Sequence, residues 1–183
     1  MRLKAKQTGY VANKIGIDLA NASFTTMPKG KEAVVEACKA VIDANLEQER
    51  KLDAKVEEML DANIDEIEIQ QAKERELFFM IKKRLAPEFG VIMNYDDRYN
   101  EVSHLILDEL YENYLLEYEV NDNQVRNVIF KGFKAFSDAY DKMDDIVYEK
   151  IQRMEKEYVP GSVEYELIYD RLYEGELKRR GML

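Results

Sequence analysis

Residues 77–85 read Leu77-Phe78-Phe79-Met80-Ile81-Lys82-Lys83-Arg84-Leu85, and a related stretch follows 95 positions later, Leu172-Tyr173-Glu174-Gly175-Glu176-Leu177-Lys178-Arg179-Arg180. In both stretches an apolar helical segment leads into a cluster of three basic residues. The same shift of 95 relates Ala40 to Ala135, Lys55 to Lys150 and Met59 to Met154. We therefore expect an internal duplication, with one unit over residues 1–93 and a second over residues 94–183.

Apolar residues recur at helical spacing in both halves. Val11, Ile15 and Leu19 lie four positions apart, as on one face of a helix, and the same pattern returns at Val102, Ile106 and Leu110. Strand-like alternation is weak, and its best example, residues 89–93, is short and falls between the two halves. The sequence predicts an all-α protein of two related helical units, each with about four helices.

Breaks in the pattern set the expected helix boundaries of the first half. A first helix is expected over residues 4–22, and Pro28 with Gly30 marks the loop after it. The polar run 47–51 interrupts the apolar pattern, so we expect a second helix to end there and a third to begin. Asn63 with Glu66 marks the expected start of a fourth helix, and Pro87 follows its expected end. In the second half, Ser162 and Gly181 mark the expected start and end of the last helix.

The composition is that of a globular chain with an acidic second half. Of its 183 residues, 46% are hydrophobic and 35% are charged, and the formal net charge is -10. Residues 1–93 contribute -1 and residues 94–183 contribute -9. A polyanion needs Lys and Arg to replace its counterions, so this balance disfavours nucleic acid as a general partner.

The sequence also indicates a compartment. Cys38 is the only cysteine, which excludes an intrachain disulfide and favours a reducing cytoplasm, with Cys38 itself a small core residue. The first residues are not followed by the apolar segment of a signal peptide, and no run of about 18 uncharged apolar residues occurs. We expect a cytoplasmic protein without a membrane partner.

Eleven of the twelve tyrosines lie in the second half. Tyr165, Tyr169 and Tyr173 are spaced four apart, and a similar run ends the first helix of that half at Tyr111, Tyr114 and Tyr118. One interpretation is that these rings are core residues with their hydroxyls at the rim. The alternative is a partner site, because tyrosine is enriched at protein interfaces.

The basic clusters also allow two interpretations. Lys82, Lys83 and Arg84, like Lys178, Arg179 and Arg180, stand at the expected C-terminus of a helix, where positive side chains oppose the helix dipole. The functional alternative is that an acidic partner or a phosphate backbone binds both clusters. We further expect residues 77–85 to be the more deeply buried stretch and residues 172–180 to meet a partner.

Signals for chemistry are few. Glu101 and His104 have the Glu-x-x-His spacing of carboxylate-bridged metal sites, but His104 is the only histidine and its counterpart at the shift of 91 is Asn13. No phosphate-binding glycine loop or nucleophile elbow occurs. Glu101 and His104 are therefore weak metal candidates, and we expect no catalytic residue and no cofactor.

The second half ends in a motif that is more specific, Val159-Pro160-Gly161-Ser162-Val163-Glu164-Tyr165-Glu166-Leu167-Ile168-Tyr169, followed by Tyr173 and Lys178-Arg179-Arg180-Gly181. It resembles the closing motif of a bacterial family catalogued as domain-of-unknown-function family five hundred and seven, and residues 103–110 resemble that family's opening helix. The first half resembles the family more loosely, since it lacks the Val-Pro-Gly-Ser turn. The resemblance implies an uncharacterised cytoplasmic bacterial protein in a tandem arrangement, and it brings no activity, cofactor or catalytic residue.

The leading hypothesis is a non-catalytic interaction or scaffold protein whose acidic, tyrosine-rich second half meets a protein partner. The first alternative is an RNA- or ribosome-associated factor that uses the basic helix ends. The second is an enzyme based on carboxylates or a metal.

Overall fold

Two long helices organise the chain, α2 (Gly30–Asp61) and α6 (Asp122–Gln152). In the computed structural model, which describes residues 3–62, 71–156, 158–160 and 162–182, shorter helices accompany them. These are α1 (Thr8–Ala20), α4 (Gln71–Leu85), α5 (Tyr95–Glu112) and α7 (Val163–Arg179), with 3-10 turns at Ala5–Gln7 and Ala86–Phe89. The protein is mostly helical, as the sequence predicts.

One small element departs from the helical prediction. β1 (Thr25–Thr26) pairs antiparallel with β2 (Glu117–Tyr118), so that Thr25 lies opposite Tyr118. Each strand lies in the loop between the short and the long helix of its half, and the pairing ties these two loops together. The strand-like residues 89–93 instead form the end of a 3-10 turn and a connecting segment.

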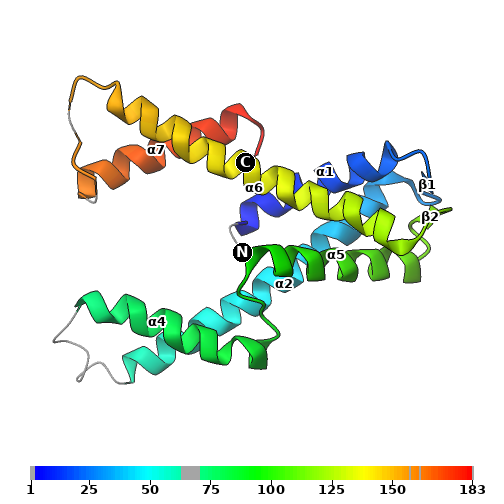
Figure 1. The fold of residues 1–183 in the computed structure, drawn as a ribbon, viewed down its shortest axis with the longest axis horizontal. Helices are drawn as coiled ribbons and strands as arrows, with labels where there is room; N and C mark the ends of the chain where they lie inside the picture. Colours follow the sequence, from blue (N-terminus) through cyan, green and yellow to red (C-terminus); the bar gives the residue numbers. More distant parts are fainter. Residues whose placement is uncertain (1–2, 63–70, 157, 161, 183) are drawn as a thin grey trace.

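The central body consists of α1, α5 and the adjoining parts of both long helices. α1 packs against α2 and α6, and α5 packs against the same two helices (Figure 1). The main core therefore draws on both halves of the chain, and its fully buried side chains include Val11, Ile15, Leu19, Val34, Cys38, Ile42, Val102, Ile106, Leu110, Val125, Ile129 and Phe133. The expected boundary at residues 93 and 94 falls in the segment that leads into α5, where Asn94 is the N-cap.

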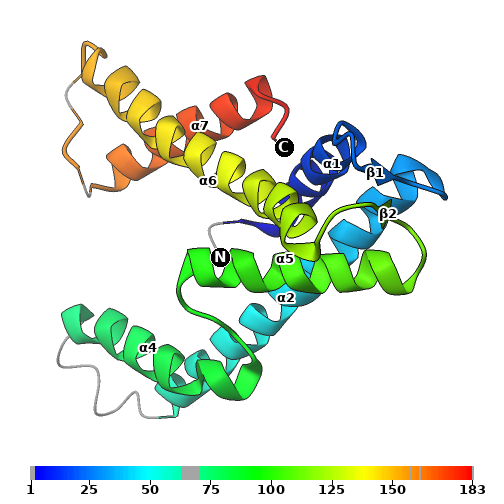
Figure 2. The same ribbon diagram turned by 45° about the vertical axis from the view of Figure 1, so that its right-hand side comes forward.

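Two arms project from this body and diverge (Figures 1 and 2). In the first arm α4 packs against the second half of α2, and in the second arm α7 packs against the second half of α6. The first arm has a separate core of Leu52, Val56, Leu60, Ala86 and Val91. The core of the second arm continues that of the body through Met143, Val147, Ile151, Tyr173 and Leu177.

Several expected helix ends are confirmed. The Ser162 hydroxyl accepts a hydrogen bond from the Tyr165 backbone N–H at 3.1 Å, and Gly181 ends the last helix with a positive φ of 66°. α4 ends at Leu85, and Pro87 follows within a 3-10 turn. The expected cap formed by Asn63 and Glu66 lies outside the described residues.

The expected break at residues 47–51 is wrong, because α2 runs without interruption from Gly30 to Asp61. The run contains no Gly or Pro, and Glu47 and Arg50 stabilise the helix as an exposed pair at i and i+3. The third helix expected from Leu52 is therefore the continuation of α2. In the second half α6 is also continuous, so its described residues form three helices, not four.

The expected burial of the two repeated stretches is reversed. Phe79 and Met80 on α4 are 56% and 66% exposed, whereas Tyr173 on α7 is buried. Of the helices that the structure describes, α4 packs against α2 and the adjoining turn Ala86–Phe89, and none of these covers Phe79 and Met80. Within the described ranges, no helix is long and apolar enough to span a membrane.

Candidate functional site

A buried arginine joins the body to the first arm. Arg98, in the first turns of α5, is only 2% exposed. Its Nε donates to Asn45 Oδ1 at 2.7 Å, its Nη2 donates to the Asn45 carbonyl oxygen at 3.0 Å, and its Nη1 donates to Glu49 Oε2 at 2.7 Å. A buried guanidinium is stable only when such partners replace its lost water.

Glu49 also faces the first arm. Lys82 Nζ on α4 lies 3.1 Å from Glu49 Oε1 and 2.6 Å from Asp53 Oδ1. Burial acts to raise the pKa of Glu49, but neighbouring positive groups, Arg98 and Lys82 among them, outweigh it and lower this pKa to about 2. Burial likewise acts to lower the pKa of Lys82, yet the hydrogen bonds with Asp53 and Glu49 raise it. We call Arg98, Asn45, Glu49, Lys82 and Asp53 the arginine network.

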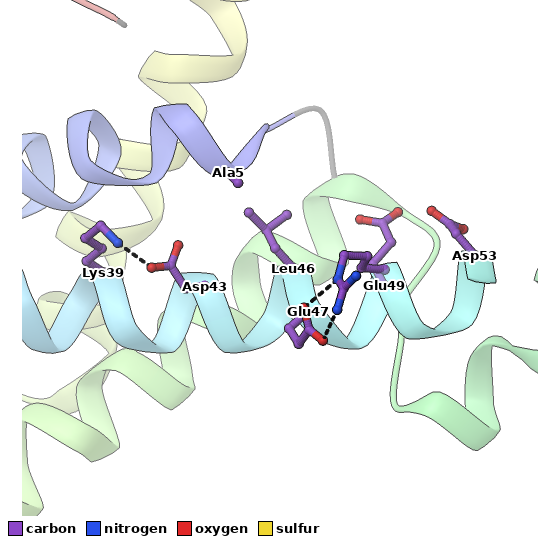
Figure 3. A pocket seen from close by; sticks show the side chains of 8 residues that line it. Ala5, Lys39, Asp43, Leu46, Glu47, Glu49 and Asp53 are labelled. Carbon is purple, nitrogen blue, oxygen red and sulfur yellow. Dashed lines mark hydrogen bonds and ion pairs between the residues drawn. The ribbon is translucent and has the colours of Figure 1, made fainter. Parts of the chain in front are cut away.

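A cavity of about 610 Å³ opens along α2 beside this network (Figure 3). Its charged side chains are largely engaged with one another. Lys39 pairs with Asp43 at 2.5 Å, and Arg50 Nε lies 2.7 Å from Glu47 Oε2. Most charged groups on the cavity surface therefore already have a partner of opposite charge. The described lining residues are Ala5, Lys39, Asp43, Leu46, Glu47, Glu49, Arg50 and Asp53.

The two basic clusters have different surroundings. Lys82 belongs to the arginine network, while Lys83 and Arg84 are exposed. In the other cluster the pairs are internal: Lys178 Nζ lies 3.7 Å from Glu174, and Arg179 and Arg180 lie 2.6 and 3.9 Å from Glu176. The Glu176 side chain is buried and also pairs with Lys150 of α6. Among the described residues, four of the six basic side chains thus have a carboxylate partner.

Tyr165, Tyr169 and Tyr173 form a ladder on α7 that faces α6. Consecutive rings are stacked, with centroids 6.2 and 5.8 Å apart, and Tyr140 of α6 meets the Tyr173 ring edge-on at 5.2 Å. The Tyr169 hydroxyl donates to Asp144 at 2.5 Å, and burial together with this bond raises the pKa of Tyr169. Tyr173 is buried and the other two rings are half-buried. The ladder holds α7 against α6.

The second run of tyrosines is far more accessible. Tyr111 and Tyr114 are 65% and 75% exposed, and Tyr118 is half-buried. With Glu112, Leu116 and Glu117 they line a cavity of about 320 Å³, which we call the tyrosine pocket. Its lining residues belong to the end of α5, to β2 and to the residues between them, and these segments lie at the end of the body opposite the two arms (Figures 1 and 2).

The backbone of the tyrosine pocket is unusual at Tyr114. This residue follows the end of α5 with a positive φ of 52°, and Leu115 N–H donates to the Leu110 carbonyl at 2.9 Å. Glycine is the usual residue at such a helix end, because a side chain there costs conformational energy. In the part of the chain that the structure describes, Tyr114 is the only non-glycine residue with positive φ.

The pocket is also acidic. The Tyr118 hydroxyl donates to Asp122 at 2.8 Å, and burial together with this bond raises the pKa of Tyr118 to about 12, so that its ring is neutral at physiological pH. Among the described residues, neither Glu112 nor Glu117 has an ion-pair or hydrogen-bond partner for its carboxylate. Lys29 Nζ donates to the carbonyl of Asn113, which precedes Tyr114, at 2.8 Å.

The weak metal candidates do not form a ligand set. Glu101 is exposed, and His104 Nε2 accepts from Arg126 Nη1 at 2.5 Å, which places a cation where a metal would bind. Within the described residues no group of three or more His, Cys, Asp or Glu side chains could hold a metal ion.

Sequence reasoning overlooked Arg98, Asn45 and Glu49 as a unit. The sequence gives no sign that these side chains meet, because Arg98 lies 53 and 49 positions from Asn45 and Glu49.

Comparison with known proteins identifies a family. The family described as "Protein of unknown function (DUF507)" matches residues 1–182, and the chain therefore belongs to this family. The match spans both halves of the chain. A search of the curated proteins finds no match.

Proposed function

We propose that this member of the DUF507 family is a non-catalytic binding protein in which the two arms contact a protein partner. The observation that carries the proposal is the exposure of large apolar side chains on both arms. On the second arm Val163 and Leu167, one turn apart on α7, are 74% and 67% exposed, and Phe79 and Met80 are exposed on the first.

The architecture supports this interpretation. Each arm is only two helices thick, so the outward face of α4 and of α7 has no neighbouring helix among those in the structure. A spacer would carry polar residues there, because exposing clustered apolar surface to water is unfavourable. Both arms instead present apolar groups on separate projections, an arrangement suited to holding a partner at two points.

The proposal also includes an internal duplication of the chain and a cytoplasmic location. The order of short helix, two-residue strand, long helix and arm helix occurs in each half. Together with the shift of 95 in the sequence, this order supports an internal duplication with units over residues 1–93 and 94–183. A single buried cysteine supports a reducing, cytoplasmic location.

The decisive experiment is affinity capture with the tagged full-length chain from its native cells, with and without nuclease. The test variants are Leu167→Lys and Met80→Lys, each of which places a charge on one arm. The matched control is Leu105→Lys, because Leu105 is a 43% exposed apolar residue on α5 in the body. Circular dichroism and the midpoint of thermal unfolding check that each variant is folded.

A partner that survives nuclease, is lost with either arm variant and is retained with Leu105→Lys supports the proposal. Capture that is the same for all three variants contradicts a role for the arms. Loss of every partner after nuclease favours the alternative of an RNA- or ribosome-associated factor, whose contacts would then include the exposed Lys83 and Arg84.

A further inference from the structure

We propose that the tyrosine pocket is a binding site for an arginine side chain of a partner peptide. The site lies at the opposite end of the body from the arms, so the inference does not depend on the arms binding anything. It is carried by three features that converge at the end of α5: exposed aromatic faces, unpaired carboxylates and a helix C-terminus.

The aromatic faces come first. Tyr111 and Tyr118 have ring centroids 6.4 Å apart and planes inclined at 52°, so they do not stack on each other as the rings of the α7 ladder do. Tyr114 is the most exposed large aromatic of the described residues. Open tyrosine faces attract cations through the ring quadrupole, and planar guanidinium groups also stack on them.

The charge of the pocket has the matching sign. Glu112 and Glu117 line the cavity and have no ion-pair partner among the described residues, and Asp108 and Asp122 are close enough to act on the pKa of Tyr118. The C-terminal carbonyls of α5 add the negative end of a helix dipole. Lys29 shows that this end of α5 does accept a cation, since its Nζ already donates to the Asn113 carbonyl.

The shape of the site favours arginine over lysine. Two separate carboxylates can accept hydrogen bonds from different edges of one guanidinium, while the tyrosine rings cover its plane. A lysine ammonium is a compact point charge and uses only part of such a surface. The cavity of about 320 Å³ is at the lower end of the range for ligand sites, which suits one side chain and not a large cofactor.

The backbone conformation of Tyr114 also supports the proposal. Positive φ at Tyr114 turns the chain sharply after α5 and places this ring beside Tyr111 and Tyr118. Glycine would satisfy the backbone better but would supply no ring. The variant Tyr114→Gly therefore removes the aromatic group while favouring the observed backbone, so that a binding defect is not a folding defect.

The test is a nuclear magnetic resonance titration of the ¹⁵N-labelled full chain with acetyl-arginine amide. Acetyl-citrulline amide is the matched ligand, because it has nearly the same shape without the charge, and tetramethylammonium is a cation without hydrogen-bond donors. We expect arginine to shift the amide signals of residues 111–118 at millimolar concentration. Tyr114→Gly should weaken binding about two- to fivefold, the value of one exposed cation–π contact. The double variant Glu112→Gln with Glu117→Gln should weaken it further.

The control variant is Tyr148→Ala, since Tyr148 is a half-exposed tyrosine on the second arm and should not affect binding. Equal affinity for citrulline, tighter binding of tetramethylammonium, shifts that map elsewhere, or unchanged affinity in Tyr114→Gly would each overturn the proposal. Because the arm variants Leu167→Lys and Met80→Lys leave this pocket intact, their effect on partner capture separates failure of the arm proposal from failure of this one.

Discussion

Replacement of Glu49 by glutamine tests the arginine network most directly. The substitution keeps the size of the side chain but removes the charge that faces Arg98 and Lys82. Arg98 would then remain buried with only Asn45 and one amide oxygen as partners. Removing one member of a buried ion pair commonly costs about 3–5 kcal/mol, because the remaining charge is left uncompensated.

The pKa of Glu49 gives an independent estimate of the stability that the variant loses. The pKa of Glu49 falls from an ordinary 4.5 to about 2 in the folded protein, and because Glu49 is only partly buried, about 3 kcal/mol is the upper limit of the stability that this gap represents. Since the folded pKa is the lower one, this stability is complete above about pH 4.5 and is lost as the pH falls toward 2. The variant lacks this contribution at every pH.

Urea unfolding followed by circular dichroism at several pH values between 7 and 2.5 measures the difference. We expect Glu49→Gln to be less stable by up to about 3 kcal/mol at pH 7 and the two curves to converge in acid. Urea is preferred to a guanidinium salt because it leaves charges unscreened. Hydrogen exchange of residues 76–85 would show whether the first arm, with its separate core, opens before the body.

The control is Glu57→Gln, because Glu57 is exposed on the same helix and its replacement should change stability by less than about 0.5 kcal/mol. Two results would refute the reasoning. One is a loss at pH 7 that is no larger for Glu49→Gln than for the control, and the other is a difference that does not shrink below pH 4.5.

Two further predictions concern packing. A Cβ at Gly132 of α6 would lie 2.7 Å from Ile15 Cγ1, so Gly132→Ala should lower the free energy of unfolding by roughly 1–3 kcal/mol. A Cβ at Gly175 of α7 would have nothing within 4 Å, so Gly175→Ala should raise the free energy of unfolding by up to about 1 kcal/mol. Equal effects of the two variants in urea unfolding would contradict the close contact of α1 and α6. Burial raises the pKa of the Cys38 thiol to about 12, so iodoacetamide at pH 8 should alkylate the native protein only when it unfolds. The urea-unfolded chain should react rapidly, and mass spectrometry measures both rates. Fast alkylation of the native protein would contradict this burial.

Local patterns explain what the sequence could predict. Val11, Ile15 and Leu19 are all fully buried, because helical spacing alone places them on one face. The cap at Ser162 and the left-handed end at Gly181 also depend only on neighbouring residues. Such features can be read from a short window without knowledge of the fold.

The parts that could not be predicted depend on residues far apart in the chain. The run 47–51 predicts a break because it interrupts the apolar pattern. Glu49 lies instead between Arg98 and Lys82, which are 49 and 33 positions away. Nothing in the window around Glu49 reveals these partners. The exposure of Phe79 and Met80 is not predictable from their neighbours in sequence either, since it depends on which helices pack against α4.

The helices of the two arms are held together by different chemistry, and this difference accounts for part of the uneven tyrosine content. At the shift of 95, the counterparts of Asn45, Glu49 and Lys82 are Tyr140, Asp144 and Leu177. In the first arm α4 is held against α2 by the ion pairs of Lys82 with Glu49 and Asp53, while in the second arm α7 is held against α6 by stacked rings and by the Tyr169 hydroxyl, which donates to Asp144.

Tyr140, Tyr165, Tyr169 and Tyr173 contribute to packing within the second arm. The rings of Tyr111 and Tyr114 instead lie mostly in solvent, and Tyr114 holds a backbone conformation that glycine would adopt more easily. Of the two tyrosine runs that the sequence presents as equivalent, only the one at the end of α5 combines exposure, strain and unpaired carboxylates. That combination is the reason to look for a ligand there and not on the face of α7 that packs against α6.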